Sequence, residues 1–215
     1  NIEQLAQFQH EFNQLQQGLP LAYIIGERDF WRLSLLVNPS VLIPRPDTEC
    51  VVEKVLALGQ GKQWRVADLG TGSGAIALSL ALEHPDWQIM ATDISADSLA
   101  VAQANAVKNN IHHVEFKQGS WLAPLTGLFD CIVSNPPYIA NDDPHLSDLQ
   151  YEPIGALVAA DNGLSDLKDI VRLSSDFLHK NGWLVLEHGF QQGATVQVLL
   201  QQAGFVNVDS GRDLG

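Results

Sequence analysis

The first group of residues that could bind a ligand joins an acidic side chain to a glycine-rich segment. Asp68 ends an apolar run at 65–69, and Gly70-Thr71-Gly72-Ser73-Gly74 follows before a helix-forming stretch. A glycine-rich turn between a strand and a helix lets a ligand approach the backbone, and the helix N-terminus offers free N–H groups. In dinucleotide sites such a turn binds pyrophosphate, but a carboxylate here would repel that anion and attract a cation. We expect Asp68 to neutralise an ammonium group, directly or through water.

A second acidic residue, Asp93, ends the next predicted strand, 25 positions after Asp68. Carboxylate oxygens can accept both hydroxyls of a ribose, and dinucleotide-binding chains place their ribose-binding acid about 20 residues on. The alternative is an acid that stabilises a helix N-terminus through the helix dipole. Because Asp93 occurs together with Asp68 and the glycines, nucleoside binding is favoured, and the neighbouring Ile94 is included in the predicted cofactor site.

Ser120 and Trp121 follow the third predicted strand, at the edge of the sheet where ligands of such sheets bind. The ring of Trp121 could pack against an adenine or lie in the core, and the spacing does not distinguish the two. Taken together, these residues predict a site for S-adenosyl-L-methionine, which carries an α-ammonium group beside a nucleoside. The product left in that site would be S-adenosyl-L-homocysteine.

The second group of chemical interest is Asn135-Pro136-Pro137-Tyr138, directly after the apolar run 129–134. Two consecutive prolines fix φ and remove two N–H donors, so the strand ends in a stiff corner rich in acceptors. The Asn135 side-chain oxygen and the Pro136 carbonyl can both accept hydrogen bonds from one NH₂ group. Tyr138 can cover a planar group with its ring. The corner suits a carboxamide or an aromatic amine, and the alternative is an ordinary turn that ends a strand.

Such a corner predicts methyl transfer to nitrogen. An amide nitrogen is a poor nucleophile because its lone pair is delocalised into the carbonyl, and two acceptors on its N–H bonds would place the nitrogen and favour charge building there. Orientation of two reactants can contribute roughly 7–11 kcal/mol. A fixed acceptor can add about 2.7–4 kcal/mol, by analogy with single oxyanion-hole donors. No general base is evident, and we expect the proton to leave through water.

The elements that position these residues alternate between short apolar strands and helices. Strands are expected at 65–69, 88–92, 114–117, 131–134, 183–186 and 205–208, and helices at 75–84, 95–108, 164–179 and 191–203. This alternation predicts an α/β fold with a doubly wound, mostly parallel sheet that is buried on both faces.

The N-terminal part of the chain has a helical pattern of apolar residues and no alternation of strands and helices. Apolar residues recur every three or four positions in a helix expected at 1–17, as Ile2, Leu5, Phe8, Phe12 and Leu15. We expect this stripe to pack on the next domain or on preceding helices. A β-hairpin is expected at 29–46, with the turn at Asn38-Pro39-Ser40, and a helix begins after it, near Asp47.

Composition restricts the classes of partner. Hydrophobic residues make up 46% of the 215 residues, the net charge is −13, and the 12 Lys and Arg residues are scattered. A protein that binds duplex nucleic acid normally carries a basic face, so we expect no direct nucleic-acid partner. Cys50 and Cys131 match no metal spacing, which favours a reduced cytoplasmic setting and no metal site. No stretch is long and apolar enough to span a bilayer, so no membrane partner is expected.

Several motifs resemble those of the release-factor glutamine N5-methyltransferase family, which are class I S-adenosylmethionine-dependent enzymes with a Rossmann-like fold. The resemblance covers nearly the whole chain. Asn-Pro-Pro-Tyr alone is shared with adenine-N6 DNA methyltransferases, whereas the Pro-Arg-Pro-Asp-Thr-Glu segment is much more specific. The matching segments are Ile43-Pro44-Arg45-Pro46-Asp47-Thr48-Glu49, Asp68-Leu69-Gly70-Thr71-Gly72-Ser73-Gly74, Ser134-Asn135-Pro136-Pro137-Tyr138-Ile139, Tyr151-Glu152-Pro153, Leu186-Glu187-His188-Gly189 and Arg212-Asp213-Leu214-Gly215.

The resemblance implies methylation of the glutamine in the Gly-Gly-Gln loop of peptide-chain release factors, by a cytoplasmic protein that we expect to be a monomer. It implies three regions: 1–28 as the end of a helical substrate-binding domain, 29–46 as a hairpin linker and 47–215 as the methyltransferase domain. The cofactor would be bound by Asp68, Gly70, Thr71, Gly72, Ser73, Gly74, Asp93, Ile94, Ser120, Trp121 and Asn135. The substrate would be bound by Arg45, Pro46, Glu49, Asn135, Pro136, Pro137 and Tyr138.

Two departures from the family and several alternatives remain open. Ser120 stands where the family often has Asp, so an acidic contact near the adenine is expected to be lost. The chain begins at Asn1 and ends before the family's last antiparallel strand, and we expect a truncated fragment. Alternatives are a sister family that methylates a ribosomal protein, an adenine-N6 nucleic-acid methyltransferase and a non-catalytic binding module. Glu187 and His188 end a strand at the ligand edge, where a minor site role is one interpretation.

Overall fold

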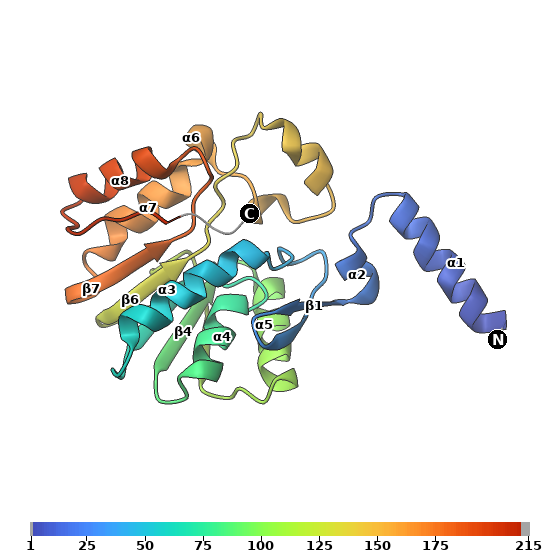
Figure 1. Cartoon of the computed structure of the whole chain (residues 1–215), viewed down its shortest axis with the longest axis horizontal. Coiled ribbons are helices and arrows are strands. Elements are labelled where there is room, and N and C mark those ends of the chain that lie inside the picture. The colour runs from blue at the N-terminus through green and yellow to red at the C-terminus, as the bar shows by residue number, and fades with distance from the viewer. Residues whose placement is uncertain (1, 212–215) are drawn as a thin grey trace.

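A five-stranded parallel sheet lies at the centre of the computed structural model, which describes residues 2–211 (Figure 1). Its strand order is β5-β4-β3-β6-β7, and every neighbouring pair is parallel. The strands are β3 (Arg65–Leu69), β4 (Gln88–Asp93), β5 (Val114–Gln118), β6 (Phe129–Ser134) and β7 (Leu178–Leu186). The chain runs outward from β3 to β5 and then crosses to β6, so the strand order reverses between β3 and β6. Ligands of doubly wound sheets bind at the carboxyl ends of the strands at such a reversal.

Helices cover both faces of this sheet, which confirms the predicted doubly wound α/β fold. On one face, α3 (Glu49–Gly59), α4 (Ala75–Glu83) and α5 (Ala96–Lys108) cover a core that includes Val66 and Val133. On the other face, α7 (Ser165–Ser174) packs on Leu69 and Ile132, and α8 (Gly193–Gln202) contacts α7. Successive strand residues face opposite sides, so strands buried on both faces have the nearly continuous apolar sequence of β6.

Short helical segments lie in the connections near the carboxyl edge of the sheet. They are η1 (Pro46–Thr48), η2 (Pro144–Leu149), η3 (Ile154–Ala156) and α6 (Ala160–Gly163). The segment from β6 to α7 forms the arm at the top of Figure 1, and an isolated parallel bridge between Ile139 and Val158 ties its two ends together.

The predicted hairpin exists, but its predicted turn is wrong. The strands are β1 (Glu27–Phe30) and β2 (Leu33–Leu36), paired antiparallel with Phe30 opposite Leu33, so the turn lies at Trp31-Arg32. The segment 41–43, expected to be the second strand, is not in a strand. The turn follows from burial, because Phe30, Leu33 and Leu35 are all in the core beneath it. Asn38-Pro39-Ser40 makes a separate turn, in which Asn38 Oδ1 accepts the Ser40 N–H.

Two other boundaries were also predicted incorrectly. The helix expected at 164–179 ends at Ser174, since Leu178 pairs with Phe129 in the sheet and Phe129 N donates to Phe177 O at 2.8 Å. The strand expected at 205–208 does not form: these residues belong to no described strand, and Val206 is exposed. The predicted motif at 212–215 lies outside the described residues.

The first helix, α1 (Ile2–Gln16), forms as predicted and projects away from the sheet (Figure 1). The short helix α2 (Leu21–Ile25) links it to β1. No residue of α1 is buried, and its apolar stripe at Ile2, Leu5, Phe8, Phe12 and Leu15 faces solvent. The structure therefore does not place this stripe against the next domain, which was one of the two predicted positions.

Candidate active site

The glycine-rich loop after β3 has a backbone that only glycine adopts without strain. Gly70, Gly72 and Gly74 have φ of 69°, 56° and 86°, in the left-handed region. A Cβ added at Gly72 would meet no heavy atom within 4 Å, so this part of the loop borders open space. Thr71 and Ser73 between the glycines are buried. The loop leads directly into α4, whose first N–H groups are available to it.

Asp68 lies beneath this loop at the end of β3, with 1% of its surface exposed. Its Oδ2 accepts hydrogen bonds from Thr71 Oγ1 at 2.6 Å and from Ala77 N at 3.1 Å. Its Oδ1 is buried and has no partner among the described residues. Burial raises the pKa of this carboxyl to about 7, against the two hydrogen bonds that lower it. The unfilled acceptor fits a donor such as a water that links Asp68 to a ligand ammonium group.

Asp93 lies at the end of β4, next to the loop. Its Oδ2 accepts the Gly72 N–H at 2.9 Å and its Oδ1 accepts the Ser95 N–H at 2.9 Å. These bonds hold the carboxylate against the loop and leave further lone pairs on both oxygens. Ile94 beside it is 73% exposed, which is unusual for a large apolar residue between a strand and a helix. Asp68, Asp93 and the loop therefore come together as predicted.

Trp121 covers the other side of the loop. Its ring lies against Gly70, where an added Cβ would come within 3.2 Å of it, and its carbonyl accepts from Thr92 Oγ1 at 2.9 Å. The ring also packs against the core on the α7 face. The ring of Trp121 therefore lies between the core and the glycine-rich loop. Ser120 before it is exposed.

The Asn-Pro-Pro-Tyr corner lies next to the glycine-rich loop because β3 and β6 are neighbours in register. Leu69 pairs with Ser134, and Ser134 Oγ donates to the Leu69 carbonyl at 2.7 Å. Gly70 and Asn135 are the next residues on the two strands, so the cofactor motif and the reacting motif leave the sheet side by side.

Two side chains of the corner form hydrogen bonds to residues of other segments. Asn135 Nδ2 donates to Thr48 Oγ1 at 3.1 Å, and Tyr138 Oη donates to Glu187 Oε1 at 3.0 Å. Burial raises the pKa of Tyr138 and of Glu187, although polar groups of Thr48 and Tyr138 near the Glu187 carboxylate lower the latter. With its nitrogen engaged, Asn135 presents its side-chain oxygen as the free acceptor.

A cavity of about 500 Å³ opens in front of this corner. Asn135, Pro136 and Tyr138 line it, and so does Arg45. The remaining lining residues come from the position before α2, from the segment before η1, from η1 and from the β6–α7 connection: Pro20, Leu42, Ile43, Asp47, Ile139, Asp148, Leu149, Glu152, Ala156 and Leu157. Its size suits a side chain inserted from another molecule.

Three predicted substrate residues do not line this cavity. Pro46 and Pro137 are adjacent in sequence to lining residues but do not line the cavity themselves. Glu49 faces the hairpin instead, and its Oε1 accepts the Trp31 N–H at 2.7 Å. Glu49 therefore joins the hairpin turn to the start of α3, and this position does not suit direct substrate contact.

The structure adds Glu152, Thr48 and Glu187 to the predicted set. The buried Glu152 forms an ion pair with Arg45 and accepts the Ile43 N–H at 3.0 Å, so it joins the segment before η1 to the β6–α7 connection. Thr48 and Glu152 belong to segments that the sequence singled out without giving these residues a role. Glu187 was assigned only a minor role. The signal that could have found Glu152 is its place in Tyr151-Glu152-Pro153, one of the segments that carry the family resemblance.

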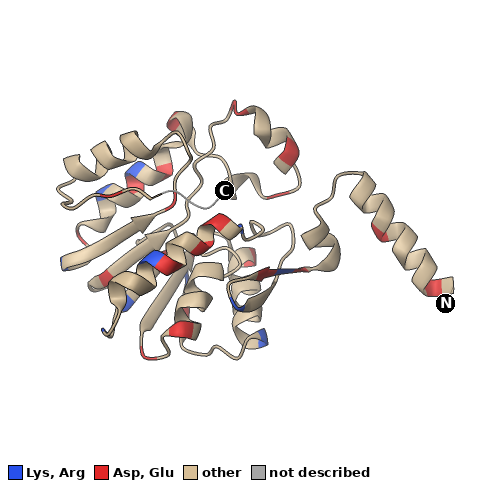
Figure 2. Ribbon diagram, in the orientation of Figure 1, with Lys and Arg blue, Asp and Glu red and all other residues tan. Residues whose placement is uncertain are grey.

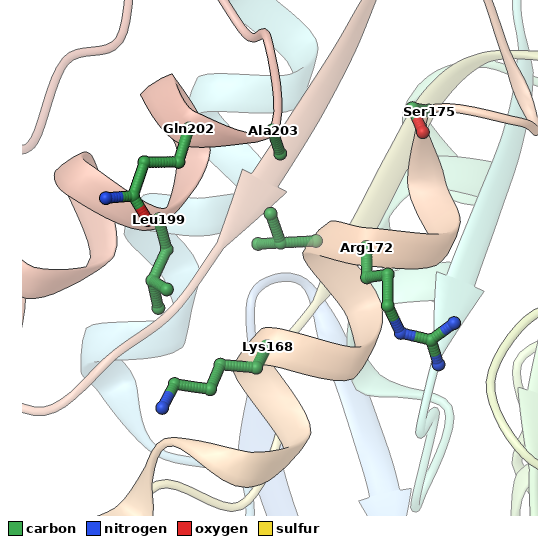
Figure 3. A pocket seen from close by; sticks show the side chains of 7 residues that line it. Lys168, Arg172, Ser175, Leu199, Gln202 and Ala203 are labelled. Carbon is green, nitrogen blue, oxygen red and sulfur yellow. The ribbon is translucent and has the colours of Figure 1, made fainter.

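A second hollow lies between α7 and α8 and contains none of the predicted residues (Figure 3). Lys168 and Arg172 line it, but they form ion pairs with Asp161 and Asp169. We therefore take the carboxyl edge of the sheet as the candidate site. Within residues 2–211 no group of three His, Cys, Asp or Glu side chains is arranged to hold a metal ion. No helix in the described part of the chain has the length and apolarity needed to cross a membrane.

Comparison with known proteins gives consistent results. The family model "Methyltransferase small domain" matches residues 48–150. Proteins named "Release factor glutamine methyltransferase" from Yersinia pestis and Escherichia coli (strain K12) are 51% and 46% identical to the chain. Each alignment covers 99% of this chain and 78% of the relative. The corresponding protein of Shewanella oneidensis is 46% identical, over 100% of this chain and 76% of its own length.

Solved structures share the fold at lower identity. A methyltransferase from Pyrococcus furiosus has a TM-score of 0.66 at 17% identity and covers 99% of this chain and 93% of its own. The ribosomal protein L11 methylase from Lactobacillus delbrueckii subsp. bulgaricus has a TM-score of 0.60 at 23% identity and covers 82% and 79%. These likenesses concern the fold alone.

Proposed function

The chain belongs to the release factor glutamine methyltransferase family, and on this basis we propose the reaction that it catalyses. It transfers a methyl group from S-adenosyl-L-methionine to the N5 amide nitrogen of the glutamine in the Gly-Gly-Gln motif of peptide-chain release factors. The observation that carries this proposal is the orientation of Asn135. Its amide nitrogen is engaged by Thr48 and it lines the cavity, so an acceptor oxygen is available to a carboxamide NH₂ group.

The residues after β3 and β4 fit the cofactor. The open space above Gly72 admits a ligand close to the backbone, and Asp93 is held where its carboxylate can accept ribose hydroxyls. Asp68 offers the unfilled acceptor, and its burial favours a contact through water over a direct one. Ile94 and Trp121 provide apolar surface for the adenine, beside the exposed Ser120. When bound, S-adenosyl-L-methionine supplies an electrophilic methyl group on a sulfonium.

The Asn-Pro-Pro-Tyr corner binds and orients the glutamine. Asn135 Oδ1 and the Pro136 carbonyl accept the two N–H bonds of the carboxamide, which fixes the plane of the group and the direction of its nitrogen. Pro137 keeps the corner rigid, and the Tyr138 ring covers the amide plane. Orientation of this kind can contribute roughly 7–11 kcal/mol to the rate. The proton of the methylated nitrogen leaves through water.

Residues around the cavity select the protein that enters it. Arg45, held by Glu152, lies at the wall and can contact backbone carbonyls of a bound loop. We propose the region 1–28 as the end of a substrate-binding part, the hairpin region 29–46 as its link and residues from 47 on as the methyltransferase domain. The exposed stripe of α1 supports the first of these assignments.

A protein substrate suits the charge of the molecule better than a nucleic acid. The net charge is −13, and the basic residues are spread over several elements in Figure 2, with acidic residues on the β6–α7 connection near the site. A nucleic-acid methyltransferase needs a basic surface that neutralises phosphates. We propose that the protein acts as a monomer in the cytoplasm, where release factors work.

The test is incubation with isotope-labelled S-adenosyl-L-methionine and a purified bacterial release factor, followed by tandem mass spectrometry. We expect one added methyl group on the Gly-Gly-Gln peptide, located on the glutamine side chain. A release factor with that glutamine replaced by alanine is the matched control and should stay unlabelled. Methylation elsewhere in the release factor, or transfer to RNA or DNA with steep salt dependence, would contradict the proposal.

A further inference from the structure

Four polar side chains from three separate segments meet behind the acceptor corner. Thr48 comes from the end of η1, Asn135 and Tyr138 follow β6, and Glu187 follows β7. Glu187 is brought here by the sheet, because its N–H donates to the Ser134 carbonyl at 3.0 Å, directly before Asn135. Glu187 is not among the residues that line the cavity. Any effect that Glu187 has on the reaction must therefore pass through its neighbours.

The Thr48 hydroxyl contacts Asn135 and does not cap α3. Thr48 ends η1 and continues directly into α3 with a helical backbone (φ −63°, ψ −18°), whereas a capping threonine has a non-helical backbone. Its side chain makes no capping hydrogen bond. Thr48 Oγ1 accepts from Asn135 Nδ2 at 3.1 Å, across 87 positions of sequence. The hydroxyl, which is buried, still has its own proton to donate.

Glu187 has the matching need for a donor. Its Oε1 accepts from Tyr138 Oη, whereas its Oε2 is buried and accepts no hydrogen bond from the described residues. The Thr48 hydroxyl and the Asn135 amide both act on this carboxylate, and both lower its pKa against the effect of burial. An ionised carboxylate only accepts hydrogen bonds, so any hydroxyl beside it must orient its proton toward it.

We propose that Glu187 and Thr48 are positioning residues that fix the direction of the Asn135 side-chain amide. Glu187 draws the Thr48 hydroxyl proton toward Oε2, which leaves Thr48 Oγ1 as an acceptor only. That acceptor selects the NH₂ end of Asn135, so Oδ1 is turned toward the cavity. Glu187 orients Tyr138 in the same way through Oε1.

The direction matters because both ends of an asparagine amide have the same shape. A flipped Asn135 would set its own NH₂ group against the NH₂ group of the glutamine, and two donors cannot satisfy each other. This inference rests on the proposed glutamine methylation. It adds that the specificity for a donor group is imposed from residues 48 and 187, which do not contact the substrate.

The experiment compares Thr48→Val, Thr48→Ser and Glu187→Gln with the wild-type protein and with Ser174→Ala. Valine keeps the shape of threonine without its hydroxyl, serine keeps the hydroxyl, and glutamine can donate where glutamate cannot. Ser174 is a matched control because its buried hydroxyl donates to Ile170 O in α7, away from the site. Steady-state rates with the release factor, the Kd of S-adenosyl-L-homocysteine and the melting temperature are measured for each.

We expect Thr48→Val and Glu187→Gln to lower kcat by between about 10- and 100-fold, somewhat less than the ~10²–10³ lost with a direct transition-state contact. The Kd of S-adenosyl-L-homocysteine should stay within about threefold, and Thr48→Ser and Ser174→Ala should keep near wild-type kcat. In ¹⁵N NMR spectra, the Asn135 NH₂ signals should be protected from exchange in the wild type and in Thr48→Ser, and exposed in Thr48→Val.

Three results would overturn the inference while leaving the proposed function intact. The first is an active wild type with equal kcat in Thr48→Val and Thr48→Ser. The second is that the Asn135 NH₂ signals do not change in Thr48→Val. The third is a loss of kcat in Glu187→Gln that is matched by a loss of cofactor affinity. If Thr48→Val does not fold, the comparison of Glu187→Gln with Ser174→Ala decides by the same criteria. A wild type that is folded, binds the cofactor and fails to methylate the release factor contradicts the proposed function instead.

Discussion

Among the individual side chains, Asp68 is the one whose ionisation we expect to affect ligand binding, because it is buried under the glycine-rich loop. Burial raises the pKa of its carboxyl from 3.8 to about 7. The stability that this group gives the ligand-free protein is present below pH 3.8 and is lost as the pH rises through about 7. Cofactor binding has the opposite preference, since the ionised form attracts the ammonium group. We expect affinity for S-adenosyl-L-homocysteine to rise by up to about tenfold from pH 6 to pH 8, measured by calorimetry.

Asp68→Asn is the control for this pH dependence. It should bind S-adenosyl-L-homocysteine more weakly at pH 8 and with little change between pH 6 and pH 8. Its ligand-free melting temperature at pH 8 should not fall, because the substitution removes a buried ionised group. An equally steep pH dependence in Asp68→Asn would assign the titration to another residue.

Asn135 separates cofactor binding from turnover. Its oxygen is proposed to contact the glutamine, so Asn135→Ala should lower kcat by about 10²–10³, the loss typical of one transition-state hydrogen bond. Affinity for S-adenosyl-L-homocysteine should change by no more than a few-fold, which calorimetry can check. Unchanged turnover in this variant would count against hydrogen bonding of the amide as the basis of the reaction.

The residues that could be predicted from the sequence are those whose role depends on local order along the chain. Asp68 and Gly72 are recognisable because the strand, the loop and the helix are consecutive, and Asn135 because the prolines follow it. Thr48 and Glu152 act on residues 87 and 107 positions away. Such contacts are set by the packing of separate segments, and a single sequence carries no direct sign of them.

Among the helices and strands, those with a clear period were predicted and those fixed by tertiary contacts were not. The sequence predicted the five strands of the sheet and α4, α5 and α8, but β7 begins at Leu178 and not at the expected residue 183. The hairpin turn was misplaced because Asn38-Pro39-Ser40 has stronger turn chemistry than Trp31-Arg32. The turn at Trp31 is stabilised from outside, by Glu49 on its N–H and by Glu83 on its indole nitrogen at 2.8 Å.

The connection between β6 and α7 depends on one buried carboxylate. Glu152 accepts from Arg45 and from Ile43 N, and only 3% of its side chain is exposed. Glu152→Gln keeps the shape and removes the charge, so we expect a loss of about 1.5–3 kcal/mol in the free energy of unfolding, as for other hydrogen bonds to charged groups. The KM for the release factor should rise, because Arg45 and the cavity wall would lose their support. Cofactor affinity should not change.

Chemical denaturation and steady-state kinetics measure both effects. Asp169→Asn is the matched control, since its ion pair with Arg172 is exposed and should contribute little. If Glu152→Gln and Asp169→Asn destabilise the protein equally, the ion pair with Arg45 does not hold the connection in place.

The whole molecule consists of a well-packed catalytic part and a first helix, α1, which contacts α2 and has no buried residue. Phe8 and Phe12 of α1 stack on each other, with ring centroids 6.0 Å apart, and are 61% and 46% exposed. An exposed apolar stripe of this kind marks an interaction surface. Because the stripe is remote from the cofactor loop (Figure 1), its role is expected to concern the release factor and not the chemistry.

The double substitution Phe8→Ala/Phe12→Ala tests this assignment. The melting temperature and the Kd of S-adenosyl-L-homocysteine should stay at wild-type values, because neither ring is buried against the sheet. The KM for an intact release factor should rise by about 10-fold or more, the scale for loss of an aromatic interface contact, whereas the KM for a short Gly-Gly-Gln peptide should not change. Gln9→Ala, a polar position on the same helix, should leave both KM values unchanged. Equal effects on the peptide and on the intact protein would mean that α1 acts through the stability of the catalytic part, and the proposed substrate-binding role would fail.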